Sequence, residues 1–510
     1  MAWTIVLVVL AVLALFLVAV AVYDLVQRKH AILRNFPIIG HFRYLLEAVG
    51  PELRQYIVTD NNEERPFSRD DRRWVYSIAK QSNPYFGFGT DNDLEQSRNY
   101  AIFKQSMFPL DGPADAPAHP DPDRPLVCAK VLGATHGRRY AFRPNSIVNV
   151  SGMSFGSLSG PAIEALDRGC ALAGALHTTG EGGITPHHLH GADLVWQIGT
   201  GYFGCRNEDG SFSLEKAVAQ ALSAPIKAIE IKLSQGAKPG LGGLLPAHKV
   251  TPEIAALRGV PAGVACKSPA AHTAFSDVAS LIDFVEMVAD ATGVPVGIKS
   301  AVGQGHFWTE LATQMAQTGR GPDFITIDGG EGGTGAAPLS FSDHVSLPFR
   351  WGFTRVYRAF AEAGITDDIV FIGSGKLGLP QSAFTAFALG CDMVNVGRTA
   401  LFSIGCIQAQ RCHTDRCPTG VATQNRRLTR GLDPADKGVR CGNYLAGVRF
   451  ELERLSWACG VPHPAMVDPD MVEILEDRWS AETLRTMVGY EPGWGTPSQS
   501  LLDALALHLG

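Results

Sequence analysis

The chain is 510 residues long, which is enough for one large domain with extensions or for two to three smaller domains. Its 44 Lys and Arg residues face 50 Asp and Glu residues without a basic patch or a block of like charge, which argues against nucleic acid as a partner. Ten cysteines, far below the density of a small secreted domain, indicate reduced thiols in a cytosolic compartment.

The N-terminal segment is an uncharged apolar run from Thr4 to Tyr23. Twenty residues at the helical rise span about 30 Å, the thickness of the hydrocarbon core of a bilayer. A cleaved signal peptide with Ala19–Val20–Ala21 at its cleavage site is the alternative, but it would need a basic start and a shorter apolar core. The sequence therefore predicts a transmembrane anchor over residues 1–24.

The charges around this run predict its orientation. No Lys or Arg precedes the run, and the cations that follow it are Arg28, Lys29, Arg34 and Arg43. Because positive residues stay on the cytoplasmic side of a membrane, we expect an outer N-terminus and a cytoplasmic remainder.

Residues 25–125 are predicted to form a membrane-proximal extension. Apolar residues recur at helical spacing over 41–60 and are interrupted by Gly50 and Pro51, which indicates two short helices. The rest of the extension reads as irregular structure with aromatic side chains that pack on the main domain. Its last part, 111–125, is rich in Pro, Asp and Ala, which is typical of a linker.

Beyond residue 140, short apolar runs alternate with amphipathic stretches rich in Ala and Leu. Eight runs end in Gly or polar residues, and they cover 146–152, 175–183, 228–236, 263–269, 294–300, 324–333, 369–375 and 393–399. This pattern predicts an α/β fold, a (β/α)8 TIM barrel, whose active site lies on the loops after the strands. A doubly wound sheet shares the alternation, but the first run ends SGMSFGSLSG, which lacks the G-x-G-x-x-G register.

The last two runs carry a candidate phosphate site. One ends in Gly373-x-Gly375 and the other in Gly397–Arg398. In a barrel, the loops after strands 7 and 8 commonly bind phosphate, because glycine amides and a nearby Arg can hold a dianion. A single G-x-G is more often only a turn, but the two together indicate a phosphorylated cofactor such as FMN.

Charged and polar residues gather at the predicted barrel mouth. Strand alternation places Glu230, Lys232 and Ser234 on one face, where polar side chains are costly unless they are paired or used. The residues of this group are Glu230, Lys232, Ser234, Gln235, Lys238, Arg258 and Lys299. Such cations would bind a dicarboxylate and stabilise the electron-rich edge of a reduced flavin. Structural ion pairs with Glu181 and Glu230 are the alternative interpretation.

The stretch from Cys406 to Gln424 contains three closely spaced cysteines. Cys406, Cys412 and Cys417 follow the pattern C-x5-C-x4-C, and Pro418 comes next. Thiolates are the ligands that iron–sulfur clusters prefer, and three of them suit a 3Fe-4S cluster. A zinc site completed by His413 and three unrelated buried thiols are the alternatives.

The C-terminal part, residues 426–510, contains two or three helical stretches joined by turns with Pro. We expect a helical extension that caps the barrel or packs against the membrane-proximal extension. Cys441 or Cys459 could supply a fourth ligand and give a 4Fe-4S cluster, although both are distant in sequence.

Five motifs carry a family resemblance. They are, in order, SGMSFGSLS, GEGG, EIKLSQGAKPG, DGGEGGTGAAP and CIQAQRCHTDRCPTGVATQ. Together they resemble the FMN-binding synthase domain of the glutamate synthase large subunit over residues 126–425. In that family the domain binds FMN and a 3Fe-4S cluster, aminates 2-oxoglutarate with ammonia and reduces the imine to L-glutamate with reduced FMN. The resemblance implies the same fold, cofactors and reaction here.

The resemblance also implies roles for individual residues. The implied cluster ligands are Cys406, Cys412 and Cys417. The residues implied to hold the oxo acid are Lys232, Gln235, Lys238, Arg258 and Glu181. The residues implied to hold FMN are Gly152, Met153, Ser154, Lys299, Gly332, Gly333, Gly373, Gly375, Gly397 and Arg398.

The chain also departs from the family. The family's glutaminase domain and β-helix are not recognisable in the sequence, and neither is a dinucleotide-binding unit. Within the resembling part, Leu244 stands where the family has Gln, and SPAAHT stands where it has S-P-P-P-H-H. We therefore expect ammonia or another amine as co-substrate and a separate electron donor, namely a reductase subunit, a ferredoxin or a quinone. One alternative is an amine-transferring relative that makes an N-substituted glutamate. The other is a membrane-bound flavin and iron–sulfur protein that only transfers electrons.

Overall fold

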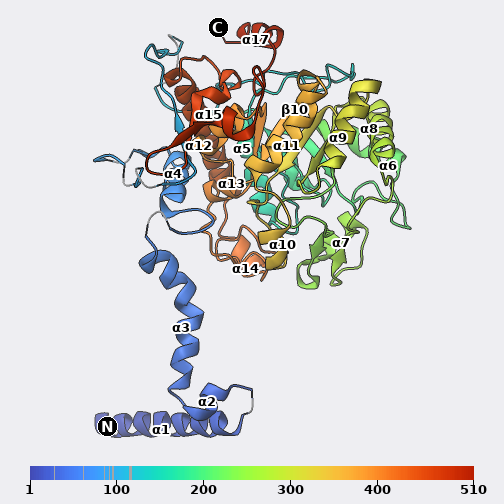
Figure 1. The fold of residues 1–510 in the computed structure, drawn as a ribbon. Helices are drawn as coiled ribbons and strands as arrows, with labels where there is room; N and C mark the ends of the chain where they lie inside the picture. The colour runs from blue at the N-terminus through green and yellow to red at the C-terminus, as the bar shows by residue number, and fades with distance from the viewer. Residues whose placement is uncertain are drawn as a thin grey trace. The chain divides into compact units, whose positions relative to one another are not determined.

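The computed structural model describes residues 1–27, 29–60, 63–85, 87–90, 92–94, 97–113 and 118–509. Arg28, which enters the orientation prediction, and part of the linker predicted over 111–125 lie outside these residues. The chain forms two compact units, Met1–Asp71 and Arg72–Gly510, coloured from blue at the N-terminus to red at the C-terminus in Figure 1.

The first unit is helical. It contains α1 (Ala2–Val26), α2 (Ala31–Asn35), α3 (Gly40–Leu53) and a π-helical turn, η1 (Arg54–Val58). The apolar window of α1 has a mean hydropathy of 3.5 and is unburied, so the helix is long and apolar enough to cross a membrane, a test that a signal sequence also passes. The break predicted at Gly50 and Pro51 is wrong, because α3 continues through both residues. Pro51 lacks only its own N–H, so one helical hydrogen bond is lost.

The second unit contains a closed barrel of eight parallel strands, as the sequence predicted. The strands are β2 (Val148–Val150), β3 (Leu176–Thr178), β4 (Asp193–Ile198), β5 (Ile226–Lys232), β8 (Val296–Ser300), β9 (Phe324–Asp328), β10 (Val370–Ser374) and β11 (Met393–Val396). Neighbours in sequence are neighbours in the barrel, and the pairing of Val394 with Val148 closes it. Parallel strands bring all their carboxyl ends to one rim.

One of the predicted barrel strands is wrong. The stretch 263–269 contains β7 (Cys266–Lys267), which pairs antiparallel with β6 (Leu244–Leu245) in a separate two-stranded sheet. The barrel instead uses β4, whose apolar side chains are interrupted by Gln197. That glutamine is buried and donates a hydrogen bond to Glu230, so a polar residue in this strand does not mark a loop.

Helices surround the barrel and cover its ends. The longer ones are α5 (Gly160–Leu172), α6 (Leu214–Leu222), α8 (Val278–Thr292), α9 (His306–Thr318), α11 (Phe349–Glu362) and α12 (Pro380–Ala388), and the short α13 (Arg398–Ser403) follows β11. Ser159 caps α5 by accepting a hydrogen bond from the N–H of Ala162, and Asp277 caps α8 in the same way. Three short helices, α7 (Pro252–Arg258), α10 (Leu339–His344) and α14 (Arg426–Thr429), lie together at one end of the unit in Figure 1.

The C-terminal part is anchored by α15 (Pro434–Ala458), which packs on α5. A Cβ atom on Gly169 of α5 would lie 2.4 Å from Cβ of Cys441, so glycine allows the close approach of the two helices. The part is not purely helical as predicted. Its strands β12 (Val472–Leu475) and β13 (Ala481–Thr483) form an antiparallel sheet with β1 (Tyr100–Phe103) from the N-terminal side of the barrel.

The remaining elements are short or lie at the edges of the second unit. They are α4 (Arg69–Ala79), α16 (Leu484–Val488), α17 (Gln499–Ala506) and the 3-10 turns η2 (Pro186–His188), η3 (Ala247–Lys249), η4 (Thr366–Asp368), η5 (Pro464–Met466) and η6 (Pro469–Met471).

Candidate active site

Apart from Arg258, which ends α7, the sequence-predicted site residues lie at or after the carboxyl ends of the barrel strands. Those after β2 are Gly152, Met153 and Ser154, and Glu181 follows β3. Lys232 ends β5 and is followed by Gln235 and Lys238, while Lys299 lies at the end of β8. The loops after β9, β10 and β11 carry Gly332, Gly333, Gly375, Gly397 and Arg398. Because the barrel is parallel, the topology brings these positions to one rim.

An acid lies buried in the barrel interior below the rim. Glu230 of β5 accepts hydrogen bonds from Nε2 of Gln197 (2.5 Å) and from the hydroxyl of Thr326 (2.9 Å). Both carboxylate oxygens are thus satisfied by neutral groups. Glu230 therefore links three strands and does not neutralise any of the predicted cations.

The rim cations meet a carboxylate at Glu181. Nζ of Lys232 lies 3.1 Å from Oε2 of Glu181 and donates a hydrogen bond to Oε1 of Gln235 at 2.7 Å. The side chains of Lys232 and Glu181 are 12% and 19% exposed, so the pair is largely shielded from water. Burial alone would raise the pKa of Glu181, but the charges of Lys232, Lys238 and Arg258 outweigh it and lower the pKa.

Lys238 and Arg258 also act on Glu181, and each is held by a backbone carbonyl. Nζ of Lys238 donates to the carbonyl of Gly242 at 2.8 Å, and burial lowers its pKa. Arg258 donates to the carbonyl of Phe155 at 3.0 Å, and its guanidinium lies 5.1 Å from the ring centroid of Phe203.

The charges of this pocket do not cancel. Lys232, Lys238 and Arg258 all act on the carboxylate of Glu181, so three positive groups face one negative group. Cations therefore outnumber carboxylates around Glu181, which suits an anionic ligand such as a dicarboxylate.

The β6–β7 hairpin closes over Glu181. A Cβ atom on Gly243, which precedes β6, would lie 2.9 Å from Oε1 of Glu181 and 3.0 Å from the hydroxyl of Ser268. A larger residue at position 243 would have to displace the side-chain ends of Glu181 and Ser268. Leu244 follows immediately and is partly exposed, which places an apolar side chain next to the cation pocket.

Two residues that the sequence analysis did not identify, His272 and Tyr202, support the backbone of Lys232. Nε2 of His272 lies 2.9 Å from the carbonyl of Lys232, and Nδ1 lies 3.1 Å from the hydroxyl of Tyr202. Burial lowers the pKa of His272 to about 4, so the ring is neutral at pH 7. A carbonyl can only accept, so Nε2 carries the proton and Nδ1 accepts from Tyr202. The SPAAHT stretch contained this histidine, but nothing in the sequence tied it to Lys232.

The backbone at Gly397, after β11, faces open space beside the loop after β2. A Cβ atom on Gly397 would have Sδ of Met153 at 3.9 Å and Cβ of Ser151 at 4.0 Å as its nearest neighbours, so the space in front of Gly397 is open. Nζ of Lys299 faces the same loop, 3.3 Å from the hydroxyl of Ser151 and 3.7 Å from the carboxylate of Asp328. Backbone amides, an open cradle and a cation are what a flavin phosphate and ring need.

Gly373 and Gly375, the two glycines of the predicted phosphate loop, have different structural roles. Gly375 has a φ of 116° and packs against the backbone of Gly329, which a side chain would not permit. A Cβ atom on Gly373 would instead meet Leu377, Phe349 and Cys391, so this glycine faces the helices.

Arg398 lies between the loops after β9 and β11. Its Nη2 donates to the carbonyl of Glu331, and its side chain passes within 2.6 Å of where Gly333 would carry a Cβ atom. Burial lowers the pKa of Arg398, and the carboxylates of Asp328 and Glu331 offset part of that effect.

The cysteine loop begins after α13. The hydroxyl of Tyr76 donates to the carbonyl of Cys406 at 2.7 Å, and Lys249 donates to the carbonyl of Cys412 at 2.9 Å. Burial, with added repulsion from Cys412 and Cys417, raises the pKa of Cys406 to about 12. The three thiols are therefore near enough to repel one another as thiolates.

Cys417 differs from the other two thiols. Burial would raise its pKa, but N–H groups of Ala422, Thr419 and Val421 and the hydroxyl of Thr419 favour the thiolate, and the pKa is lowered. This donor chemistry suits an iron–sulfur ligand. In the part of the chain that the structure describes, however, no three His, Cys, Asp or Glu residues are grouped closely enough to hold a metal ion.

The alternative cluster ligands lie elsewhere. Cys441 is buried in α15 against Gly169 of α5, and Cys459 follows the C-terminal end of α15. His413 is exposed beside Cys412. The structure thus gives no support for a fourth protein ligand from α15.

Comparisons with known proteins agree on one family. The family described as the conserved region in glutamate synthase matches residues 131–462. A glutamate synthase large subunit-like protein of Bacillus subtilis, YerD, is 38% identical over 474 residues, which are 86% of this chain and 88% of that protein. The archaeal glutamate synthase [NADPH] of Methanocaldococcus jannaschii is 35% identical over 317 residues, which are 62% of this chain and 59% of that relative, so the match spans little more than half of the longer protein.

Solved structures with a similar arrangement include two groups of enzymes. A mandelate oxidase structure aligns with a TM-score of 0.41 and 14% identity over 74% of this chain and 87% of its own. A variant of flavocytochrome b2 aligns with a TM-score of 0.44 and 13% identity over 90% of this chain and 96% of its own.

Proposed function

The chain belongs to the family defined by the conserved region in glutamate synthase, and from this premise we propose that it reductively aminates 2-oxoglutarate to L-glutamate with FMN. The catalytic barrel spans residues 126–425. The observation that supports this best is the pocket in which Lys232, Lys238 and Arg258 surround the single carboxylate of Glu181.

In this proposal the pocket binds the oxo acid by charge. The surplus of cations around Glu181 would offset the two carboxylates of 2-oxoglutarate, and the hydrogen-bonded pair of Lys232 and Gln235 would orient them. Glu181 remains ionised, so its carboxylate can accept a hydrogen bond from the ammonium or the imine N–H. The β6–β7 hairpin over Glu181 excludes water from this end of the pocket.

FMN is the cofactor that we propose for the loops after β2 and β11, supported by the open space at Gly397 and the nearby Lys299; when bound it would supply the hydride that reduces the imine carbon. The residues that would hold it are Gly152, Met153, Ser154, Lys299, Gly332, Gly333, Gly373, Gly375, Gly397 and Arg398. Lys299 would place its charge beside the flavin, and Arg398 with the glycine amides would bind the phosphate.

A 3Fe-4S cluster on Cys406, Cys412 and Cys417 is the proposed entry point for electrons. The hydrogen-bond donors around Cys417 support a thiolate ligand there. Cluster assembly would have to draw the three sulfurs together, since they do not form a ready ligand group. The electrons would come from a separate donor, a reductase subunit, a ferredoxin or a quinone.

The proposed location is a membrane, with α1 as a single span and the barrel in the cytoplasm. The length and hydropathy of α1 support the span, and Lys29, Arg34 and Arg43 behind it support the orientation.

One observation favours a second candidate function. Leu244 lies directly beside Gly243 at the edge of the pocket, where an apolar side chain would suit an alkyl group on the amine. This would make the enzyme a relative that forms an N-substituted glutamate.

Anaerobic reoxidation of the photoreduced flavin tests both candidates. The synthase predicts that 2-oxoglutarate with ammonia reoxidises the flavin and yields glutamate, whereas the alternative predicts faster reoxidation with methylamine and formation of N-methylglutamate. If neither amine reoxidises the flavin, the protein only transfers electrons and the proposal is wrong.

A further inference from the structure

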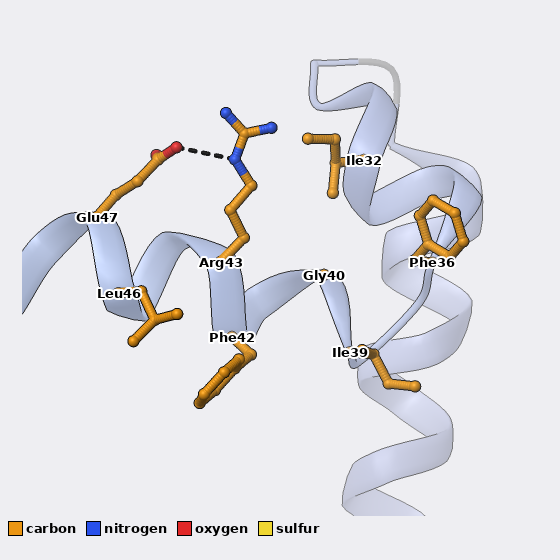
Figure 2. Close-up of a pocket in the computed structure, with 8 residues that line it drawn as sticks. All are labelled: Ile32, Phe36, Ile39, Gly40, Phe42, Arg43, Leu46 and Glu47. Carbon is orange, nitrogen blue, oxygen red and sulfur yellow. Dashed lines mark hydrogen bonds and ion pairs between the residues drawn. The ribbon is translucent and has the colours of Figure 1, made fainter.

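The first unit carries an apolar groove beyond α1. Figure 2 shows Ile32 from α2, Phe36 and Ile39 from the connection between α2 and α3, and Phe42 and Leu46 from α3 around this groove, whose volume is about 500 Å³. Phe36, Ile39 and Phe42 are 62%, 77% and 61% exposed. Exposed apolar surface of this kind marks a protein or membrane contact.

The groove is fastened to the end of α1. Asp24, in the last turn of α1, is buried, and its carboxylate accepts a hydrogen bond from the N–H of Ile38 at 2.9 Å. Nε2 of His41 lies 2.9 Å from the same carboxylate. These contacts fix the start of α3 to the C-terminal end of α1.

Gly40 lets α2 and α3 meet at the groove. A Cβ atom there would lie 3.0 Å from Cδ2 of Leu33 and 3.2 Å from the carbonyl of Ile32, so a larger residue would push the helices apart. The close approach of α2 and α3 at Gly40 and the bonds from Asp24 to Ile38 and His41 therefore fix the segments that line the groove.

Charged residues accompany the groove on the same segments. Arg43 and Glu47 line it, and Glu47, drawn in Figure 2, accepts a hydrogen bond from Nε of Arg43 at 2.8 Å. Lys29, just before α2, and Arg34, within α2, are exposed. An apolar face with aromatic residues and flanking cations is the composition of a helix that lies in the membrane interface. Its cations would meet anionic headgroups.

We propose that the α2–α3 groove is a second membrane-contact element that lies in the headgroup region of the bilayer and takes phospholipid as its occupant. The inference rests on the proposed span by α1. Continuity with that span favours lipid over a second copy of the chain, because Asp24 holds the groove within one helical turn of the end of α1. The contact would orient the unit on the membrane surface, which a single span alone would leave free to rotate.

Site-specific photocrosslinking of the full-length chain in vesicles of phosphatidylethanolamine and phosphatidylglycerol tests this. The variants are Phe42→p-benzoylphenylalanine at the groove, Phe16→p-benzoylphenylalanine in α1 and, as a matched exposed aromatic on the barrel unit, Tyr140→p-benzoylphenylalanine. The wild-type side chains are 61%, 62% and 50% exposed. Mass spectrometry then identifies each adduct.

We expect lipid adducts at positions 42 and 16, each at least about tenfold above position 140, because an interfacial helix buries its apolar face among the upper acyl chains. Lipid adducts at 16 but not at 42 would overturn the groove assignment and leave the anchor standing. A crosslink from 42 to a second copy would also overturn it. Lipid adducts at neither position would overturn the span and the groove together, without bearing on the chemistry of the barrel.

Discussion

Replacing Lys232 by Met should weaken binding of the oxo acid while leaving the barrel folded. Methionine has a similar length and no charge, so the change removes the cation that lies 3.1 Å from Glu181 and 2.7 Å from Gln235. The lost interaction has two parts, one with the substrate carboxylate and one with Glu181.

The contacts of Lys232 indicate how much substrate binding and how much stability the variant should lose. Two unit charges 3.1 Å apart attract by about 5 kcal/mol at an effective dielectric constant near 20, before desolvation is subtracted. Loss of one charge-assisted contact to the substrate then costs about 1.5–3 kcal/mol, or about 10- to 150-fold in Kd. Glu181 keeps Lys238 and Arg258 as neighbours, which limits the loss of stability.

The same variant changes how stability depends on pH. The lowered pKa of Glu181 stabilises the fold above its ordinary value of 4.5, and this contribution is lost as the pH falls through the lowered value. Without Lys232 the pKa of Glu181 rises and the contribution shrinks. The Tm difference between wild type and variant should therefore be largest above pH 5 and smaller below about pH 4.

Titration of the oxidised protein with 2-oxoglutarate, followed by calorimetry or by the flavin spectrum, measures the binding effect. Lys227→Met on the same strand is the matched control, because Lys227 is exposed and its pair with Asp193 spans 3.8 Å. The control should bind normally. An unchanged Kd in the Lys232 variant, within a factor of about two, would show that the oxo acid binds elsewhere.

Three further predictions address the cofactors and the supporting residues. Gly397→Ala should keep its Tm, because Gly397 has a φ of −114° and the new methyl group meets no atom closer than 3.9 Å, but it should lower FMN affinity at least about tenfold; equal flavin content by absorbance would refute the cradle. Cys412→Ser should abolish the visible absorption and EPR signal of the cluster and leave the flavin, whereas Cys459→Ser should change neither; a normal cluster in the first variant would rule out the ligand assignment. His272 has a pKa of about 4, so the unfolded chain takes up a proton at this residue before the folded chain does. The free energy of unfolding should therefore fall by about 3 kcal/mol as the pH is lowered from 6.5 to about 4. Unfolding of His272→Gln across this range should show a smaller acid loss, and an identical pH profile would argue that the ring is already charged.

The barrel was predictable from the sequence because apolar runs that end in glycine recur around it. Seven of the eight strands coincide or overlap with the predicted runs, and the eighth, β4, was missed, although Gly199 follows it, because Gln197 interrupts its apolar residues. That side chain points to Glu230 inside the barrel, a tertiary contact with no local signal. The long stretch of sequence between β3 and β5 was the one available clue that another strand lies there. The run 263–269 was wrongly predicted as a barrel strand because it contains β7, which pairs with β6 outside the barrel.

The sequence predicted which residues form the site, but not which of them contact one another. Family motifs pointed to Lys232, Lys238, Arg258 and Glu181, and the parallel topology brings them together. Sequence could not show that Glu230 is satisfied by neutral groups, because its partners lie 33 and 96 residues away. Nor could it show that His272 supports Lys232 through its carbonyl, since backbone contacts leave no pattern in residue types.

The central claim is that one barrel rim carries both a flavin and an iron–sulfur cluster. The most direct measurement is the content of FMN, iron and acid-labile sulfide in the full-length protein after anaerobic purification. The account predicts about one FMN and about three irons per chain, with a flavin spectrum on a broad cluster absorption. A colourless, iron-free protein obtained anaerobically, folded and in good yield would contradict it.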